Sequence, residues 1–409
     1  DSDFLPGSRI VYTLGVFFRK GLERKSYMKP VTVMVLGAGC RGTGYAEYAG
    51  EFPDRARIVA VAEPREPYRR RMVETYGIDH ANVMTDWVQA IDKPRLADAV
   101  LICMPDAIHA QPAIEMAAKG YHILLEKPMA PTANECREIV KAVKKAGIIL
   151  AVGHVMRYTQ YTRALKKLLD AGAVGEVVSV HHLESVGWWH QAHSYTRGNW
   201  RNEAESSSML LAKSCHDLDW IRHIMKTPCR RLSSFGSLYH FKKANQPAGA
   251  ASRCLDCPVE PDCAYSARKI YLGRLAKGHT GWPVDVLTPN PTVETITQAL
   301  REGPYGRCVY ECDNDVVDHQ VVNMEFQGGL TATFTMTGFN QGGGRKTHIF
   351  GTKGEIYGDG SRIELFDFLT AASTEVDLNS SDASILGGHG GGDFGLIHGF
   401  ISAVATGDR

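Results

Sequence analysis

The feature that most constrains this sequence is a glycine motif directly behind a short apolar run. "VTVMVLG" (residues 31–37) reads as a buried strand, and "GAGCRG" (residues 37–42) leads from it toward a helical stretch. A strand, a tight glycine turn and a helix N-terminus in this order form the phosphate-binding unit of dinucleotide-binding folds. The alternative is a glycine turn without a ligand. We expect a bound dinucleotide, contacted by Gly37, Gly39, Cys40, Arg41 and Gly42.

An acidic residue stands where a ribose ligand is expected. A second apolar run, "ARIVAVAEP", reaches Glu63 at about the spacing of the acid that accepts hydrogen bonds from the ribose hydroxyls. A carboxylate there repels a 2′-phosphate, which favours NAD over NADP. Arg65 instead favours NADP, because a nearby arginine can bind the 2′-phosphate. We predict NAD as cofactor, with NADP less favoured.

The order of apolar runs predicts two domains. Residues 29–153 alternate short β-branched runs with helical stretches, which indicates a doubly wound parallel sheet, a Rossmann domain. Residues 154–409 contain longer alternating strands separated by glycine turns, typical of an α/β domain with a large open, mostly antiparallel sheet. We expect residues 1–28 to be an extension, either poorly ordered or artificially added. The chain ends within a helical pattern, so a further C-terminal piece is expected.

Composition limits the partners. Lys plus Arg number 46 and Asp plus Glu 45, so the formal net charge is only +1. This balance gives no reason to expect nucleic acid. No apolar run approaches the roughly 20 residues of a membrane span, so no membrane partner is expected either. Most of the ten cysteines stand alone in apolar contexts, which favours a reducing compartment, the cytoplasm.

A second set of motifs resembles a known family. The run "ICMPDAIHAQPAIEMAAKGYHILLEKPMAPTANE" places Pro105 at one strand end and "EKP" at the next, and "CHDLD" follows later. Together with the glycine motif it resembles the Gfo/Idh/MocA family of sugar and polyol oxidoreductases. The resemblance implies a homodimer or homotetramer formed through the outer face of the open sheet. It also implies cofactor contacts from Pro105, His109, Glu126 and Lys127.

The stretch "MLLAKSCHDLDW" is predicted to be one helix bearing the chemistry. The resemblance implies that His216 is the general base for a sugar hydroxyl, assisted by Lys127, and histidine titrates in the right range. Many family members have aspartate where this chain has Ala212, and Lys213 is expected to fill a related catalytic role. Asp217 is assigned to the substrate site. The alternative is a satisfied buried histidine; a metal site is not favoured here.

Two further segments carry open hypotheses. The aromatic stretch at residues 187–206 is either a substrate-binding loop or a hinge between domains. Its candidate substrate contacts are Trp189, His193, Arg197, Trp200 and Arg201. Cys254, Cys257 and Cys263 form C-x2-C-x5-C, which suits structural zinc or an iron–sulfur cluster, with Cys308 or Cys312 as a fourth ligand. Free thiols or a disulfide are the alternatives.

These expectations lead to a ranked set of functions. The first is an NAD-dependent oxidoreductase that acts on CH–OH groups of a sugar, cyclitol or sugar derivative. The second is an NAD-dependent glycosidase-type enzyme, in which transient oxidation precedes elimination. The third is a non-catalytic dinucleotide- or sugar-binding protein, since one fold hosts many functions.

Overall fold

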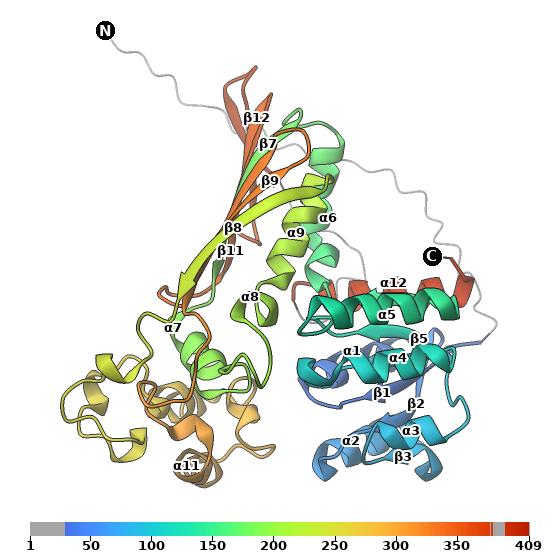
Figure 1. The fold of residues 1–409 in the computed structure, drawn as a ribbon, viewed down its shortest axis with the longest axis vertical. Helices are drawn as coiled ribbons and strands as arrows, with labels where there is room; N and C mark the ends of the chain where they lie inside the picture. Colours follow the sequence, from blue (N-terminus) through green and yellow to red (C-terminus); the bar gives the residue numbers. More distant parts are fainter. Residues whose placement is uncertain (1–28, 377, 379–388, 409) are drawn as a thin grey trace.

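The computed structural model describes residues 29–376, 378 and 389–408 of the 409-residue chain. The predicted extension, residues 1–28, lies outside the described residues. Two β-sheets organise the molecule, one in each half of the chain (Figure 1). The two-sheet fold class predicted from the sequence is confirmed.

The first sheet is a six-stranded parallel sheet with the strand order β3-β2-β1-β4-β5-β6. Five of its strands are apolar runs of the alternating pattern predicted for residues 29–153, whereas the two-residue β3 had no pattern of its own. The strands are β1 (Val31–Leu36), β2 (Ala56–Ala62), β3 (Val83–Met84), β4 (Ala99–Ile102), β5 (His122–Leu125) and β6 (Leu150–Val152). This order places the carboxyl ends of β1 and β4 side by side, where doubly wound sheets bind their ligands.

Helices connect the parallel strands and cover both faces of the sheet. They are α1 (Cys40–Glu51), α2 (Glu66–Tyr76), α3 (Val88–Asp92), α4 (Ala110–Ala118) and α5 (Ala133–Ala146). The ends of helix α5 are determined by residues directly at its two termini. Thr132 and Glu135 form a capping box at its start, and Gly147 in the left-handed conformation ends it.

The second sheet has eight strands in the order β14-β13-β12-β11-β7-β10-β9-β8. Only the central β7–β10 pair is parallel, so the sheet is mostly antiparallel, as expected. The strands are β7 (Val177–Ser185), β8 (Cys229–Ser237), β9 (His319–Phe326), β10 (Thr331–Thr337), β11 (Gly344–Gly351), β12 (Gly354–Gly358), β13 (Ile363–Asp367) and β14 (Ala372–Val376).

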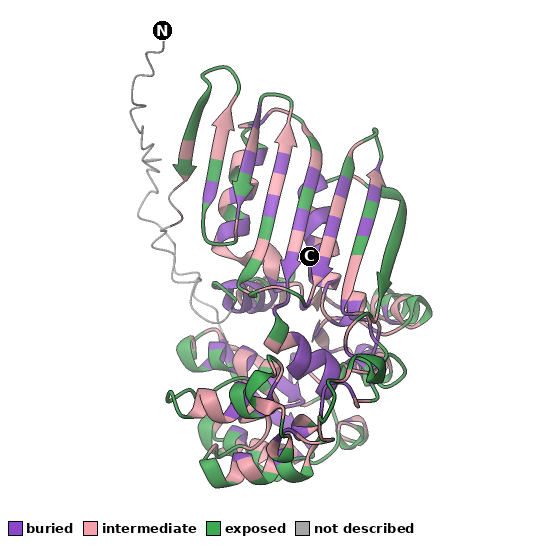
Figure 2. Cartoon of the chain, turned by 90° about the vertical axis from the view of Figure 1, so that its left-hand side faces the viewer, coloured by how far each residue is buried: buried purple, intermediate pink, exposed green. Residues whose placement is uncertain are grey.

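The two faces of the second sheet differ in exposure. Helices α6 (Gln160–Asp170), α8 (Met209–Ala212) and α9 (Cys215–Met225) lie on the inner face (Figure 1). None of the described helices covers the outer face, and burial alternates along the central strands (Figure 2). Phe235, Val321 and Tyr357 belong to the outer face and are 69%, 37% and 45% exposed.

The last helix, α12 (Gly392–Thr406), returns to the first sheet. Phe394, Ile397 and Phe400 are buried in the same apolar cluster as Val33 and Tyr48. The predicted division, with residues 154–409 together in one C-terminal domain, therefore needs correction for this helix. The sequence pattern showed a helix here but held no information about which sheet it covers.

A third, loop-rich unit spans residues 238–312 and lies below the open sheet (Figure 1). It consists mainly of short turns and 3-10 segments, with α10 (Gly273–Leu275) and α11 (Val293–Glu302) as its helices. An apolar cluster of its own includes Phe241, Tyr271, Ile296 and Leu300. The short helix α7 (Trp188–His190) and the π-helical segment η4 (Gln191–Arg197) follow β7 in the chain, and η4 contacts this unit. In the part of the chain described, no helix is long and apolar enough to cross a membrane.

Candidate active site

The glycine turn after β1 is as tight as its sequence predicts. Gly37 has φ +88°, and a Cβ there would lie 2.7 Å from the carbonyl oxygen of Cys103. A Cβ on Gly42 would lie 2.0 Å from the carbonyl oxygen of Gly37. Only glycine fits at either position, because one needs a left-handed backbone and the other a close helix-to-turn approach.

The N-terminus of α1 is suited to an anion. Its N-cap residue is Gly39, no side chain caps the helix, and no acidic residue stands in the first turn. Backbone N–H groups and the helix dipole favour negative charge at such an end. The turn and helix end therefore fit the pyrophosphate of a dinucleotide.

Glu63 lies at the end of β2, next to this turn. The carboxylate is 1% exposed and accepts hydrogen bonds from the backbone N–H groups of Ala38 (2.8 Å) and Arg65 (2.9 Å). The Arg65 guanidinium also donates to it at 2.7 and 3.0 Å. Burial acts to raise the pKa of Glu63, but the bonds from Arg65 outweigh it and hold the pKa below its ordinary value. Glu63 is thus an ionised acid at the predicted ribose position, with Arg65 committed to it.

Glu126 connects three parts of the molecule. Its Oε1 accepts from Arg41 Nε at 2.7 Å and from the Tyr45 hydroxyl at 2.8 Å, and its Oε2 accepts from the Lys127 N–H at 2.8 Å. Arg41 in turn donates to Asp393 of α12 at 2.9 Å. Arg41 and Glu126 therefore hold the glycine turn, the end of β5 and α12 together.

His109 joins the ends of two neighbouring strands. Its two ring nitrogens lie 2.8 Å from the Met104 carbonyl oxygen, beside Pro105, and 2.9 Å from the Pro128 carbonyl oxygen. The Lys127–Pro128 peptide bond is cis. The "EKP" end of β5 and the "MPD" end of β4 are thereby fixed relative to each other, beside the glycine turn.

Lys127 reaches from the first sheet to the second half of the chain. Its Nζ donates to the carbonyl oxygen of Ala212 across 2.7 Å. His216 lies in the first turn of α9, 9% exposed, with no hydrogen-bond partner at Nδ1 in the described structure. Burial lowers the pKa of His216 well below its ordinary value, and Lys127 is the charge that adds most to this. The structure therefore brings Lys127 and His216 together, with His216 neutral near pH 7.

The predicted single helix is in fact two. Helix α8 ends at Ala212 and α9 starts at Cys215, so Lys213 and Ser214 form a break that the periodicity did not reveal. As a result Lys213 and His216 do not lie on the same face of one continuous helix. Its Nζ pairs with Glu184 of β7 at 3.0 Å.

A buried charge network supports this break. Arg345 of β11 contacts Glu184 at 3.1 Å and Asp217 at 2.6 Å, and His182 Nε2 lies 3.0 Å from Asp217. Burial alone would raise the pKa of Asp217, but Arg345 and His182 hold it well below its ordinary value. Asp217 is thus ionised and fully committed to protein groups.

Sequence reasoning missed three members of that network. His182 and Glu184 occupy inward positions of β7, and Arg345 is paired with Glu184 across the strands. The available signal was that these polar residues stand at the alternate strand positions where a half-buried strand normally carries apolar side chains.

Two further missed histidines lie near the lysine and histidine pair. The His154 ring packs edge to face on His216, with centroids 6.0 Å apart. Burial lowers the pKa of His190 well below its ordinary value, and Lys213 and Lys127 both contribute, which places His190 within their electrostatic reach. Asp219, the second acid of "CHDLD", pairs with Arg157 at 2.5 Å.

The aromatic segment divides into two groups. Trp189 packs on His190 and on Trp282, and Trp200 is 38% exposed beside Tyr195. The other candidates face the loop-rich unit. His193 bonds to the Tyr271 hydroxyl at 2.7 Å, and Arg201 pairs with Asp313 at 2.8 Å.

Arg197 also faces the loop-rich unit. It donates to the carbonyl oxygens of Arg307 (2.7 Å) and Tyr265 (2.9 Å) and to Cys254 Sγ (3.4 Å). Trp189 thus packs on His190 and also on Trp282 of the loop-rich unit, and the hydrogen bonds of His193 and Arg197 tie the same segment to that unit.

The cysteine motif lies in the same unit, and all ten cysteines are free. Across residues 29–376, 378 and 389–408, no three His, Cys, Asp or Glu side chains stand as a ready metal-binding group. The predicted three-cysteine ligand set is therefore not preassembled.

Family models match two consecutive stretches of the chain. Residues 31–154 match the model described as the oxidoreductase family with an NAD-binding Rossmann fold. Residues 162–256 match the Gfo/Idh/MocA C-terminal domain. Together these stretches cover more than half of the 409 residues.

Individual relatives agree with this result. The chain is 28% identical over 191 residues to the 2,7-anhydro-N-acetylneuraminate hydratase of Escherichia coli K12, which is 47% of this chain and 48% of that protein. It is 35% identical over 150 residues to the inositol 2-dehydrogenase of Streptomyces avermitilis, 36% of this chain and 43% of that one. The chain thus spans about half the length of the curated relatives it matches. A solved levoglucosan dehydrogenase, in complex with NADH and levoglucosan, superimposes with a TM-score of 0.65 at 20% identity, over 93% of this chain and 91% of that chain.

Proposed function

The chain belongs to the Gfo/Idh/MocA family of oxidoreductases, and on that premise we propose that it transfers hydride between NAD and the hydroxyl-bearing carbon of a sugar, cyclitol or sugar derivative. The observation that carries the proposal is the meeting of Lys127 with the α8–α9 segment, 2.7 Å from the Ala212 oxygen and beside His216. This puts a cation and a neutral imidazole at the carboxyl edge of the sheet that bears the glycine turn. Bound NAD would supply the hydride acceptor there.

His216 acts as the proton acceptor in this proposal. A general base must be unprotonated at the working pH, and the lowered pKa of His216 meets that condition. Lys127 donates a hydrogen bond to the reacting oxygen, and it must exchange the Ala212 carbonyl for that oxygen when substrate binds. Such positioned proton transfer contributes about 10²- to 10⁴-fold to a rate.

Lys213 is assigned a supporting role. Its ion pair with Glu184 leaves it within the electrostatic reach of His190 and His216 rather than free to transfer protons. Lys213 therefore orients substrate hydroxyls, together with the aromatic faces of Trp189 and Trp200. Sugar C–H surfaces stack on such faces.

The proposal includes a second copy of the chain. The uncovered outer face of the eight-stranded sheet exposes Phe235, Val321 and Tyr357, and apolar side chains gathered on one face favour association. A homodimer or homotetramer is proposed, in the cytoplasm as predicted from the cysteine pattern. Light scattering during gel filtration measures the assembly directly.

A panel assay tests the activity. Purified protein is incubated with NAD and a series of sugars, anhydrosugars and cyclitols, and NADH is followed by absorbance. Net NADH that disappears in His216→Ala supports the proposal. If no substrate in the panel reduces NAD and the protein binds no dinucleotide by calorimetry, the proposal is wrong.

One observation favours a second candidate. The similarity to a hydratase is a similarity to an enzyme named for addition of water, a reaction with no net redox change. A chain with an NAD-binding domain would then use NAD only transiently. Substrate turnover on an anhydrosugar without accumulated NADH, dependent on added NAD, would select this alternative.

A further inference from the structure

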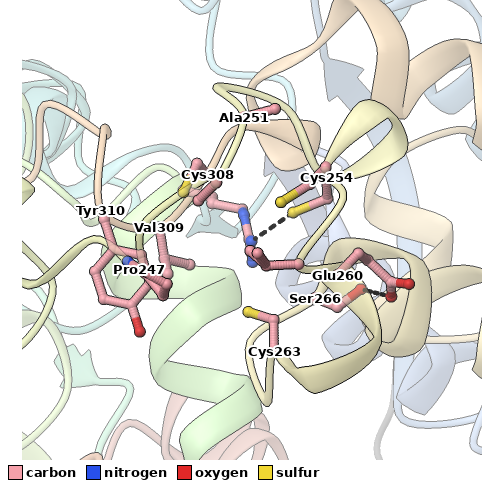
Figure 3. Close-up of a pocket in the computed structure, with 13 residues that line it drawn as sticks. Pro247, Ala251, Cys254, Glu260, Cys263, Ser266, Cys308, Val309 and Tyr310 are labelled. Carbon is pink, nitrogen blue, oxygen red and sulfur yellow. Dashed lines mark hydrogen bonds between the residues drawn. The ribbon is translucent and has the colours of Figure 1, made fainter.

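Four cysteines from two separate parts of the sequence line one pocket of the loop-rich unit. They are Cys254, Cys257, Cys263 and Cys308. The first three lie within ten residues of one loop, whereas Cys308 follows α11. Figure 3 shows Cys254, Cys263 and Cys308 on three different sides of the pocket. The fold therefore adds to the C-x2-C-x5-C motif a fourth thiol that spacing alone did not single out from Cys312.

A buried positive charge lines the same pocket. Arg197 is 1% exposed, and its hydrogen-bond partners are two carbonyl oxygens and the Cys254 sulfur, all uncharged groups as they stand. Its Nη1 has no hydrogen-bond partner, and no ion pair with a carboxylate is found for it among the described residues. Glu260 also lines the pocket, but its carboxylate accepts a hydrogen bond from Ser266 and pairs with Arg268 at 4.0 Å. An uncompensated buried guanidinium is costly, so Arg197 is left without a negatively charged partner of its own.

Deprotonated thiols would supply that charge. Four cysteine thiolates around one Zn²⁺, or around one [4Fe–4S]²⁺ cluster, leave a net charge of about −2 at the centre. Hydrogen bonds from a neighbouring donor to the cluster or thiolate sulfurs stabilise such centres. Arg197 is already within 3.4 Å of one of these sulfurs.

The unit that holds the pocket also has a physical need for a cross-link. It has few regular elements, with 3-10 turns at η6 (Cys254–Asp256) and η7 (Glu260–Asp262) forming the cysteine loop itself. Small units of this kind bury little apolar surface and are commonly stabilised by metals or disulfides. A centre here would join the cysteine loop, the chain after α11 and, through Arg197, the segment η4 that leads from the active site.

We propose that Cys254, Cys257, Cys263 and Cys308 bind a soft metal centre, zinc or a [4Fe–4S] cluster, with Arg197 as its charge-compensating neighbour. The thiols do not stand as a ready ligand set, so binding requires them to turn toward a common point. The role is structural, and it is independent of hydride transfer.

Metal analysis of the full-length wild-type protein, purified without oxygen, tests the proposal. The expected result is about one zinc, or about four iron and four acid-labile sulfides, per chain. Visible absorption of an iron–sulfur cluster distinguishes the second case from the first. Wild-type protein without stoichiometric metal, even after incubation with Zn²⁺ or with iron and sulfide under reducing conditions, overturns the proposal.

Variants then assign the ligands. Cys263→Ser and Cys308→Ser are expected to lower retained metal at least about tenfold, whereas Cys229→Ser, at an exposed cysteine of β8, retains it. Arg197→Gln is expected to keep the ligands but lose metal faster to a chelator. Equal metal content in Cys263→Ser, Cys308→Ser and Cys229→Ser would also overturn the assignment. The metal content of the wild-type protein can contradict the proposal on its own, so the test does not depend on whether a variant folds.

Discussion

Lys127 Nζ donates a hydrogen bond across 2.7 Å to the carbonyl oxygen of Ala212, in the last turn of α8. A backbone oxygen, rather than a carboxylate side chain, thus accepts the hydrogen bond of this ammonium group. A main-chain acceptor is a weaker partner than a carboxylate. The hydrogen bond of Lys127 is therefore more easily transferred to a substrate oxygen, which is the central feature of the proposed site.

Removal of the Lys127 ammonium group should impair turnover more than binding of the dinucleotide. Lys127→Met is expected to lower kcat/KM about 10²- to 10⁴-fold, because the reacting oxygen loses its hydrogen-bond donor. Calorimetry should give an unchanged NAD affinity within about threefold. Lys141→Met, on the exposed face of α5, is the matched control and should keep full activity. Equal activity of both variants would remove Lys127 from the mechanism.

The pH dependence of turnover should report His216. Its pKa is lowered by burial and by Lys127, so the imidazole stays neutral well below pH 6.5. The acidic limb of kcat/KM is expected below that value, with activity lost as pH falls through the lowered pKa. Lys127→Met removes a neighbouring charge and should shift the limb of the residual activity upward. A limb at or above pH 6.5 in the wild type would contradict the assignment.

Two glycines of α1 form a matched pair for the cofactor turn. Gly42→Ala would bring a Cβ within 2.0 Å of the Gly37 oxygen, whereas Gly44→Ala meets no atom within 4 Å. The first variant should lose about 1–3 kcal/mol of unfolding free energy and most of its NAD affinity. The second should gain about 0.5–1 kcal/mol, because alanine favours the helix. Urea unfolding and calorimetry measure both, and equal NAD affinities would argue against the turn as the pyrophosphate site.

Glu63 should select between the two dinucleotides. The ionised carboxylate repels a 2′-phosphate, and Arg65 is already bonded to it. NAD is expected to bind at least about tenfold more tightly than NADP, or about 1.4 kcal/mol. Glu63→Ser removes the carboxylate and frees Arg65 to bind a 2′-phosphate, so it should reduce or reverse the preference for NAD over NADP. Fluorescence titration of both cofactors checks it, and tighter NADP binding by the wild type would contradict the role of Glu63.

Asp393 should contribute to stability through its bonds to Arg41 and His389. Burial opposes ionisation, but these two partners lower the pKa of Asp393 to about 2. Its stabilisation is therefore complete above the unfolded value of about 4 and is lost as pH falls toward 2. Asp393→Asn should cost about 1–3 kcal/mol at neutral pH and flatten stability between those pH values. Glu138→Gln, in a surface ion pair, serves as the control in urea unfolding.

Local patterns predicted most of the fold. The alternating strands of the first sheet and the glycine turn follow from residues close together in the sequence. The break between α8 and α9 and the docking of α12 on the first sheet did not, because both depend on contacts with distant strands. Periodicity specifies an apolar face but not its partner.

The candidate site was predictable to a similar extent. Gly37 and Glu63 were predicted from the glycine motif and the spacing behind it, whereas Lys127 and His216 were predicted from the resemblance to the Gfo/Idh/MocA family. The network of Glu184, Arg345 and Asp217 was not, since it joins side chains from two strands and a helix that are brought together only by folding.

The central claim, hydride transfer promoted by His216, is tested most directly by a single-turnover experiment. Stoichiometric protein and NAD are mixed with a sugar that carries deuterium at its hydroxyl-bearing carbons, and the nicotinamide is examined by mass spectrometry after rapid quenching. We predict deuterium on the nicotinamide ring in the wild type and at least about a 10²-fold slower transfer in His216→Ala. Turnover of the sugar without deuterium reaching the nicotinamide, or equal transfer rates in the two proteins, would contradict the account.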